Sequence, residues 1–295
     1  MNSFLPHSIQ RSYIHVCICA SMAATPAFAV DVNPFDWMPA PDGTTAVFAY
    51  TPWSHDDKAV INGNKIDASL NSAIVMPRLI HYFEIGNHPA AVTALLPMGR
   101  LWNGSLGGTD LGSRTSVGDL TLAGAYWALS APQERRNLAI VGYLNVPLGA
   151  YDRDKALNIS TGAFNATLQV GNMVALSEKI TLETTADVSF YQKKNNANTL
   201  GQTLKQDNSY SLQNWLSYGI GTATTVSAGH AFYFGGAQHL DGISNGLNAE
   251  KQQVKMGITH WLTPTFCLYG QINQDFDVKG GFKGTSGMLR FAKIL

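Results

Sequence analysis

Apolar and polar residues alternate along much of the chain, and the segment from Ser209 to Ile220 shows the pattern clearly. Because successive side chains of a β-strand point to opposite faces, every second residue belongs to the same face. One face of this segment is mostly apolar and carries Tyr210 and Tyr218 near its ends. The other face is mostly small and polar, with Trp215 as the exception. The pattern predicts an amphipathic strand whose apolar face meets either a protein core or lipid.

Strands of this kind recur along the chain, and no stretch favours a helix. Twelve strands are predicted, with ends uncertain by two to four residues. Their ranges are Thr44–Trp53, Ala68–Ile85, Pro89–Met98, Val117–Ser130, Leu138–Leu148, Phe164–Leu176, Thr181–Tyr191, Ser209–Ile220, Thr222–Phe234, Gln253–Leu262, Phe266–Asp275 and Thr285–Ile294.

The connections between the predicted strands alternate between long and short. The first is the polar segment SHDDKAVINGNKID and the second is only GNH, and the alternation continues through all eleven connections. Outer-membrane barrels have this pattern, because tight turns face the periplasm and longer loops face the outside. A Greek-key sandwich has no reason to keep that order. The predicted fold class is therefore all-β, a transmembrane antiparallel up-and-down β-barrel of about twelve strands, with its apolar face toward lipid.

The N-terminus has the features of a secretory signal peptide. Arg11 supplies a positive charge, residues 14–24 form an apolar stretch, and Ala27-Phe28-Ala29 is a small-x-small cleavage site. A membrane anchor is the alternative, but the stretch is too short for the ~20 apolar residues that span a bilayer. We predict a signal peptide at residues 1–29 and an outer-membrane β-barrel domain at residues 30–295, which places the protein in the cell outer membrane.

Composition agrees with an exported barrel. Cys17 and Cys19 lie in the signal peptide, so Cys267 has no internal disulfide partner and is interpreted as a small apolar filler. Charged residues are 14% of the chain, well below the ~25% of ordinary soluble domains. Lys and Arg number 20, as do Asp and Glu, so no basic face favours nucleic acid as a partner. No apolar run reaches the ~18 residues of a transmembrane helix.

The predicted strand Ala68–Ile85 fits the alternation least well. Pro77 cannot donate a ladder hydrogen bond, so a bulge or kink is predicted there. Arg78 and Glu84 share the parity of apolar Ile74 and Met76. The two faces of this strand are therefore not assigned from the sequence.

Four motifs stand out within the predicted barrel. They are SVGDLTLAGAYWAL (116–129), GYLNVPLGAYDRD (142–154), LNISTGAFNATLQ (157–169) and the region 204–242, which contains TVSAGHAFYFGGAQHLDG. These motifs resemble the outer-membrane family labelled MetA-pathway of phenol degradation. The resemblance implies an outer-membrane, transporter-like barrel associated with aromatic catabolism.

The positions that match the family are mostly glycines and turn residues. Glycine permits positive φ or a bulge, so these positions are interpreted as architectural and not as evidence of a substrate. They are Gly118, Asp119, Gly149, Asp152, Asn158, Gly162, Tyr210, Tyr218, Gly235, Gly236, Asp241 and Gly242.

The sequence departs from the family pattern at two places. The tryptophan expected near Asn165 is missing, and the chain ends in Leu295 where such barrels usually end in an aromatic residue. The final segment MLRFAKIL is otherwise typical of a closing strand, with Leu289 and Phe291 on the same face as Leu295. The leucine is expected to weaken recognition by the barrel-assembly machinery, a predicted partner, without changing the fold.

Neither catalysis nor metal binding is predicted. His239, Ser244 and Asn245 superficially resemble an outer-membrane phospholipase, but the histidine and serine lie five residues apart in a Gly-rich loop and not on rigid strands. The stretches HDDK (55–58) and YDRD (151–154) each supply two carboxylates, whereas Ca²⁺ takes six to eight oxygen ligands. The chain is predicted not to be an enzyme and to need no cofactor.

The inward face of the strands supplies the candidate transport residues. Bore, hydrogen-bonding groups and charge set the selectivity of a lumen, and aromatic side chains there either contact a hydrophobic solute or plug the barrel. The hypothesis is a channel in outer-membrane lipid that passes small hydrophobic or aromatic compounds. A non-transporting scaffold or adhesin barrel and an outer-membrane hydrolase are the alternatives. The candidate lining residues are Ser209, Ser211, Gln213, Trp215, Ser217, Thr225, Ser227, Tyr233, Tyr191, Glu183, Asp187 and Tyr269.

Overall fold

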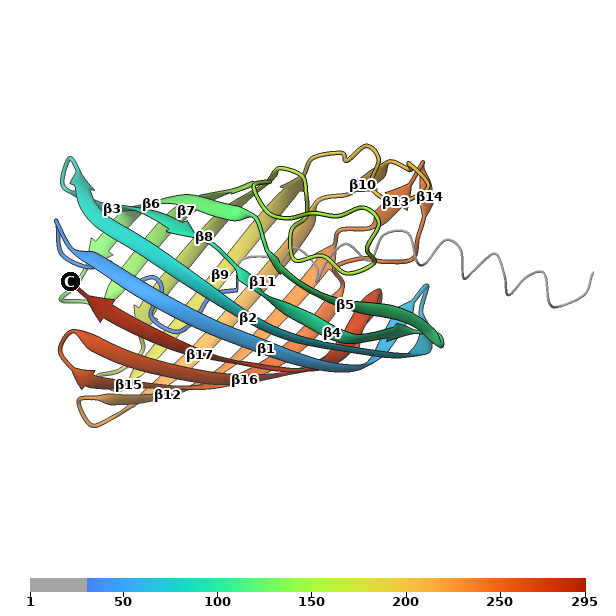
Figure 1. The fold of residues 1–295 in the computed structure, drawn as a ribbon. Coiled ribbons are helices and arrows are strands. Elements are labelled where there is room, and N and C mark those ends of the chain that lie inside the picture. The colour runs from blue at the N-terminus through green and yellow to red at the C-terminus, as the bar shows by residue number, and fades with distance from the viewer. Residues whose placement is uncertain (1–30) are drawn as a thin grey trace, which may run out of the picture.

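The computed structural model describes residues 31–295 (Figure 1). The predicted signal peptide, with Cys17 and Cys19, lies outside the described residues. The described part of the chain contains no helix long and apolar enough to cross a membrane. Its strands are β1 (Thr45–Ile61), β2 (Asn64–Ile85), β3 (His88–Leu95), β4 (Met98–Leu106), β5 (Thr109–Val117), β6 (Leu120–Ala131), β7 (Arg136–Val146), β8 (Asn165–Ala175), β9 (Ile180–Tyr191), β10 (Leu204–Gln206), β11 (Ser209–Ile220), β12 (Thr224–Gly235), β13 (Gln238–Leu240), β14 (Ile243–Ser244), β15 (Lys251–Thr263), β16 (Phe266–Val278) and β17 (Gly281–Ile294).

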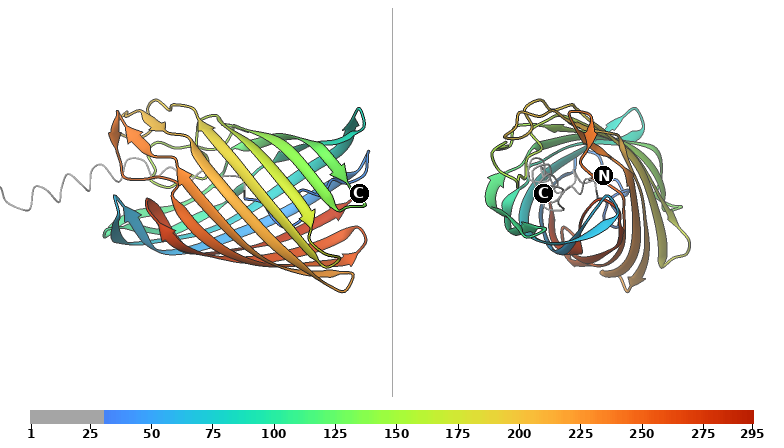
Figure 2. Two further views of the ribbon diagram at one scale, coloured as in Figure 1. Left: turned by 180° about the vertical axis from the view of Figure 1, so that it is seen from behind. Right: turned by 90° about the vertical axis from the view of Figure 1, so that its right-hand side faces the viewer.

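The main sheet closes on itself into a barrel. β1 pairs in antiparallel fashion with β2 on one side and with β17 on the other, and the end view in Figure 2 shows the resulting ring. β3 and β4 both pair with β2, one after the other along its length. β6 pairs with β3 and β5 pairs with β4, so β5 and β6 together form the next strand around the barrel. Counted as two interrupted strands, these four segments give a twelve-stranded barrel. The predicted fold class is confirmed.

The two rims of the barrel differ in their connections. The rim near the C-terminus has short turns, such as residues 86–87 and 264–265 (Figure 1). The opposite rim carries the connections 147–164, 192–208 and 236–250, and the small sheet of β10, β13 and β14 lies within the last two. Because outer-membrane barrels keep tight turns on the periplasmic side, we call the first rim periplasmic and the second extracellular.

Three connections that the sequence predicts as loops are instead strands joined by two-residue turns. β1 continues to Ile61 and turns at Asn62 and Gly63, whose φ values are 50° and 75°. β4 and β5 are joined at Gly107-Gly108, and β16 and β17 at residues 279–280. Asn-Gly and Gly-Gly suit the tight turns of β-hairpins. The loop prediction failed because these strand ends extend beyond the lipid-facing band of the barrel. Outside lipid, a strand does not require an apolar face, so the alternating pattern is absent from the sequence.

Of the bulge or kink predicted at Pro77, the bulge is not found in the described strand β2. Pro77 pairs with Ala49 of β1, whereas the shift in the β1–β2 register lies between Asp56 and Lys58. On its other side, Pro77 faces the break between β3 and β4, where its carbonyl oxygen accepts the Leu96 N–H at 3.2 Å. Proline, which has no N–H, fits at this position because no carbonyl oxygen of β3 or β4 lies opposite it to accept a ladder hydrogen bond.

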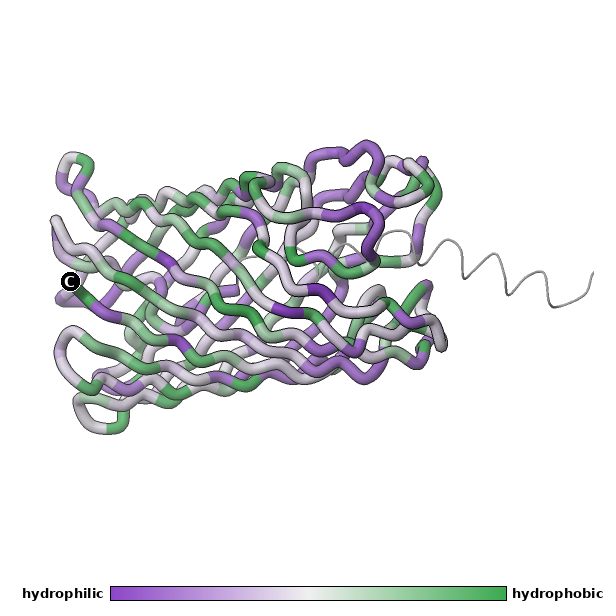
Figure 3. Tube along the Cα trace, in the orientation of Figure 1, coloured by the Kyte–Doolittle hydropathy of each residue, from purple (hydrophilic) through white to green (hydrophobic). Residues whose placement is uncertain are grey.

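The two faces of β11 are arranged as the alternation predicts. Leu216 on the outward face is 49% exposed, whereas Trp215 beside it on the inward face is 2% exposed. On β2, Val75 and Leu79 point outward, so Arg78 belongs to the inward face, which the sequence had left unassigned. Figure 3 shows hydrophilic residues gathered in the extracellular loops around β10, beyond the more hydrophobic barrel wall.

A charge on the outward face of β11 is expected to destabilise the barrel in lipid. Leu216 lies within the outward row between Tyr210 and Tyr218. Replacing it with arginine should lower the free energy of unfolding in phospholipid vesicles by about 2–4 kcal/mol, because the guanidinium enters hydrocarbon. Denaturant titration of the Leu216→Arg and Leu216→Met proteins measures the difference. Equal stability of the two variants would contradict a lipid-facing position.

Candidate functional site in the barrel lumen

Residues 31–41, which precede β1, run inside the barrel. Their hydrogen bonds are mainly with one side of the lumen, which we call the polar wall: the inward-facing residues of β8, β9, β11, β12 and β15. Val32 and Trp37 also pack against buried residues of β1, β2, β3, β6 and β7. The wall presents buried Gln169, Glu183, Thr185, Gln213 and Lys255. Buried polar side chains require hydrogen-bond partners, and the segment supplies several of them.

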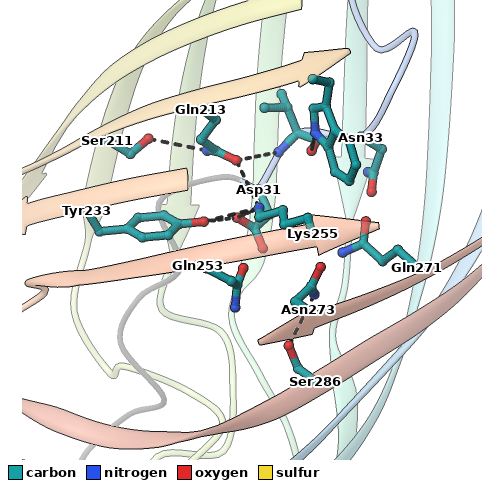
Figure 4. Close-up of polar contacts among 12 residues, drawn as sticks. Asp31, Asn33, Ser211, Gln213, Tyr233, Gln253, Lys255, Gln271, Asn273 and Ser286 are labelled. Atoms are coloured by element: carbon teal, nitrogen blue, oxygen red, sulfur yellow. Dashed lines mark hydrogen bonds and ion pairs between the residues drawn. The ribbon is translucent and has the colours of Figure 1, made fainter. Parts of the chain in front are cut away.

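The first residues of the segment are held by a hydrogen-bonded network around Lys255 (Figure 4). The Lys255 Nζ lies 2.9 Å from Asp31 Oδ1 and 3.2 Å from Gln213 Oε1. The Tyr233 hydroxyl also donates to the Asp31 carboxylate. Trp215 donates from Nε1 to the Val32 carbonyl oxygen at 2.9 Å. An ion pair and an indole therefore fix this end of the segment to three strands.

The middle of the segment is held by a second set of contacts. The Glu183 carboxylate accepts the Phe35 N–H, with N–O distances of 2.8 and 2.9 Å. Arg290 of β17, on the far side of the lumen, forms an ion pair with Asp36 at 3.0 Å. Trp37 donates from Nε1 to Thr185 Oγ1 at 2.8 Å. The segment is thus tied to both sides of the barrel.

Gly171 provides the place where Trp37 lies against the wall. It faces inward on β8, and a Cβ atom added there would overlap the Trp37 indole ring. Gly229 on β12 is covered in the same way by Trp215. Both glycines are needed because an indole lies directly on the strand backbone. The wall is therefore shaped for these two aromatic side chains.

All twelve candidate lining residues lie on the inward face, but most serve to hold other parts of the chain. Glu183, Gln213, Trp215 and Tyr233 contact residues 31–37 directly. The remaining polar side chains mostly pair along the wall. Ser211 donates a hydrogen bond to Asp187, and hydrogen bonds also join Tyr191 to Ser209 and Ser217 to Ser227. Tyr269 stacks with the Arg290 guanidinium, and Thr225 borders the cavity described next.

A cavity of about 860 Å³ remains beside the segment. Its lining includes residues near both rims, from Ala223 and Trp261 at the periplasmic end to Gly280 and Phe282 at the extracellular end. Across from the polar wall it meets a mostly apolar surface, which we call the apolar wall. The apolar wall consists of Phe48, Tyr50, Ile74, Met76, Leu95 and Met288.

Asp119 organises the positions that match the family motifs on the extracellular side. This buried carboxylate lies at the break between β5 and β6 and accepts the Gly149 N–H at 3.2 Å, the Ser160 hydroxyl at 2.6 Å and the Thr161 N–H at 2.7 Å. Gly118 and Gly149 are in close contact, since a Cβ on Gly149 would lie 2.5 Å from the Gly118 carbonyl carbon. These residues fix the loop 147–164 to the barrel.

Tyr210 and Tyr218 face outward on β11, and the other matched positions shape the extracellular loops. Asn158 accepts the Asp152 N–H at 2.9 Å, and the Asp154 N–H together with Arg114 lowers the pKa of Asp152. Positive φ is found at Gly162, Gly235, Gly236, Asp241 and Gly242.

Lys194 joins two of these loops. Its Nζ donates to the Thr161 carbonyl oxygen at 2.6 Å and lies 2.7 Å from the centre of the Tyr151 ring. Burial lowers the pKa of Lys194 to about 7. A Cβ on Gly162 would lie 2.7 Å from the Tyr151 ring, so glycine is required for this contact.

Two of the residues considered for chemistry lie on neighbouring strands of the small extracellular sheet. The sequence predicts a loop for His239 and Ser244, but the two residues pair across the β13–β14 hairpin. The Ser244 hydroxyl accepts the Gly246 N–H, and His239 Nδ1 has no hydrogen-bond partner among the described residues. Among residues 31–295, no group of three or more His, Cys, Asp or Glu side chains is arranged to hold a metal ion.

Substitution at Gly171 tests whether residues 31–41 limit the bore. Valine at this position should displace Trp37 and loosen the segment, so the Gly171→Val barrel is expected to conduct ions several-fold better than wild type in planar bilayers. Gly142→Val is the matched control, because Gly142 faces outward on β7 and an added Cβ meets nothing within 4 Å. The same conductance for all three proteins would contradict the assignment.

Comparison with known proteins agrees with this architecture. The crystal structure of the COG4313 outer membrane channel from Pseudomonas putida F1 is similar, with a TM-score of 0.85 and 28% identity over 90% of this chain and 100% of that chain. The β domain of the Bordetella autotransporter BrkA shares the fold, with a TM-score of 0.55 and 11% identity over 84% of this chain and 98% of that chain. No curated protein matches the sequence.

The family match covers most of the barrel. A family model described as "Putative MetA-pathway of phenol degradation" matches residues 49–291, which confirms the resemblance seen in the sequence motifs. The protein lies in the outer membrane. The chain belongs to the family of the putative MetA-pathway of phenol degradation.

Proposed function

We propose that the protein is a channel for small hydrophobic or aromatic compounds. The observation that carries this proposal is the division of the lumen into two walls. Residues 31–41 cover much of the polar wall, and the cavity beside them borders the apolar wall. A solute in this cavity meets the side chains of Phe48, Met76 and Leu95, so burial of its apolar surface favours entry.

The comparisons support a channel in two ways. The Pseudomonas putida protein is described as an outer membrane channel, and its structure matches 90% of this chain. The family description refers to phenol degradation, which agrees with an aromatic solute. We propose no catalytic role, and the barrel-assembly machinery stays a predicted partner.

The predicted signal peptide is part of the proposal. The first described residue, Asp31, is already bound to Lys255 inside the lumen. Cleavage after Ala29 would leave Val30 as the first residue of the mature chain, so the docked segment would begin at the new N-terminus.

Narrowing the cavity tests the proposed passage. Met76 lines the cavity, and Met76→Trp is expected to slow entry of the hydrophobic fluorescent dye N-phenylnaphthylamine several-fold, because the larger ring fills the passage. The measurement is the rate of dye fluorescence increase in Gram-negative cells, whose intact outer membrane excludes the dye.

Val75→Trp is the matched control, because Val75 is the next residue on β2 and faces outward at 46% exposure. Cells with this variant should take up the dye as fast as cells with the wild-type barrel. If cells with the wild-type protein take up the dye no faster than cells lacking it, the proposed function is wrong.

A further inference from the structure

Two guanidinium groups flank one aromatic ring on the apolar wall. Phe48 of β1 pairs with Arg78 of β2, and Arg290 of β17 pairs with Tyr50, two residues along β1. Residues two apart on a strand share a face, so all these side chains point into the lumen. The guanidinium carbons of Arg78 and Arg290 lie 5.7 and 5.9 Å from the centre of the Phe48 ring.

Arg78 differs from the other cations that line the cavity. Lys251 lies 3.5 Å from Asp275, and Arg290 lies 3.0 Å from Asp36. Arg78 has no carboxylate within 4.0 Å among the described residues, and its hydrogen bonds go to neutral hydroxyls. Its Nε donates to Thr93 Oγ1 at 2.9 Å and its Nη1 donates to the Tyr50 hydroxyl at 3.1 Å.

The carboxylates of the lumen are engaged with other donors or lie farther away. Asp36 accepts the Asn33 N–H at 2.9 Å besides its ion pair with Arg290. Glu183 accepts the Phe35 N–H. Asp56 is eight residues from Phe48 along β1, which corresponds to roughly 26 Å at ~3.3 Å per residue. Arg78 therefore has no ion-pair partner within 4.0 Å among the described residues, and Asp36, which is paired with Arg290, attracts it only from a longer distance.

An apolar cluster lies beside Arg78. Tyr50, Tyr269 and Met288 form a buried cluster against which Phe48, Met76 and Leu95 pack. A guanidinium is planar and presents paired N–H donors, which match the two oxygens of a carboxylate. Nη2 of Arg78 has no acceptor among the described residues, and the Tyr50 hydroxyl, which accepts from Nη1, keeps its own proton for donation.

We propose that this site binds a solute with a carboxylate group and an aromatic or aliphatic body. The carboxylate pairs with Arg78 and accepts from the Tyr50 hydroxyl, while the apolar body lies against Phe48, Met76 and Leu95. The inference rests on the proposed function and specifies the solute class: the channel favours hydrophobic organic acids over their neutral counterparts. The site lies near the periplasmic rim, since Phe48 is the fourth residue of β1.

Calorimetric titration of the full barrel in lipid nanodiscs tests this inference. Phenylbutyrate and its neutral amide are the probes, because they share the apolar body and differ in charge. Wild type should bind phenylbutyrate at least tenfold more tightly than the amide. Arg78→Gln should remove most of this difference by weakening phenylbutyrate binding about tenfold, with the amide unchanged.

Arg136→Gln is the matched control, since Arg136 is exposed at the start of β7 on the periplasmic rim. It should bind both probes as wild type does. Equal binding of the two probes by wild type would overturn the anion inference and leave the proposed function standing. Binding of neither probe would overturn both. A loss of both probes in a folded Arg78→Gln barrel would show that Arg78 shapes the cavity instead of binding the charge, and would also overturn the inference.

Discussion

The docking of residues 31–41 on the polar wall is the interaction on which the rest of the lumen depends. A barrel of twelve strands is wider than one of eight, which side chains alone can fill. Glu183 and Lys255 are buried, and a buried charge is costly without a partner. The segment supplies the Phe35 N–H to Glu183 and the Asp31 carboxylate to Lys255. The wall and the segment therefore stabilise each other.

This arrangement also determines the character of the space that is left. The polar wall is largely engaged by the segment, and the cavity borders Phe48, Met76 and Leu95 on the other side. The sequence predicts polar side chains on the inward faces of the strands, but the surface that a solute meets in the cavity is largely apolar. Counting polar lining residues is a poor guide to selectivity when part of the chain occupies them.

The barrel itself could be predicted because closure in a bilayer leaves a periodic trace in the sequence. Every backbone group must be paired between strands, and side chains must alternate between lipid and lumen. This periodicity placed Ser211, Gln213 and Trp215 on the inward face of β11. The prediction of the strand Thr45–Ile61 was too short, because the extracellular end of that strand lies beyond lipid and has no apolar face.

The docked segment could not be predicted, because it has no repeating pattern and its contacts are distant in sequence. Asp31 and Lys255 are separated by 224 residues. The one available signal was local: DVNPFDW follows the predicted cleavage site and combines two carboxylates with a tryptophan before the first strand. Trp215 gave the complementary signal, since a large indole on a face of serines requires something to cover it.

The same segment decides where charge is available in the passage. Asp36 neutralises Arg290, and no residue of the segment comes within ion-pair distance of Arg78, although both guanidinium groups flank the Phe48 ring. With the segment docked, Arg78 is hydrogen-bonded to neutral hydroxyls and has no ion-pair partner within 4.0 Å among the described residues. The position of Asp36 therefore decides which of the two guanidinium groups has an ion-pair partner.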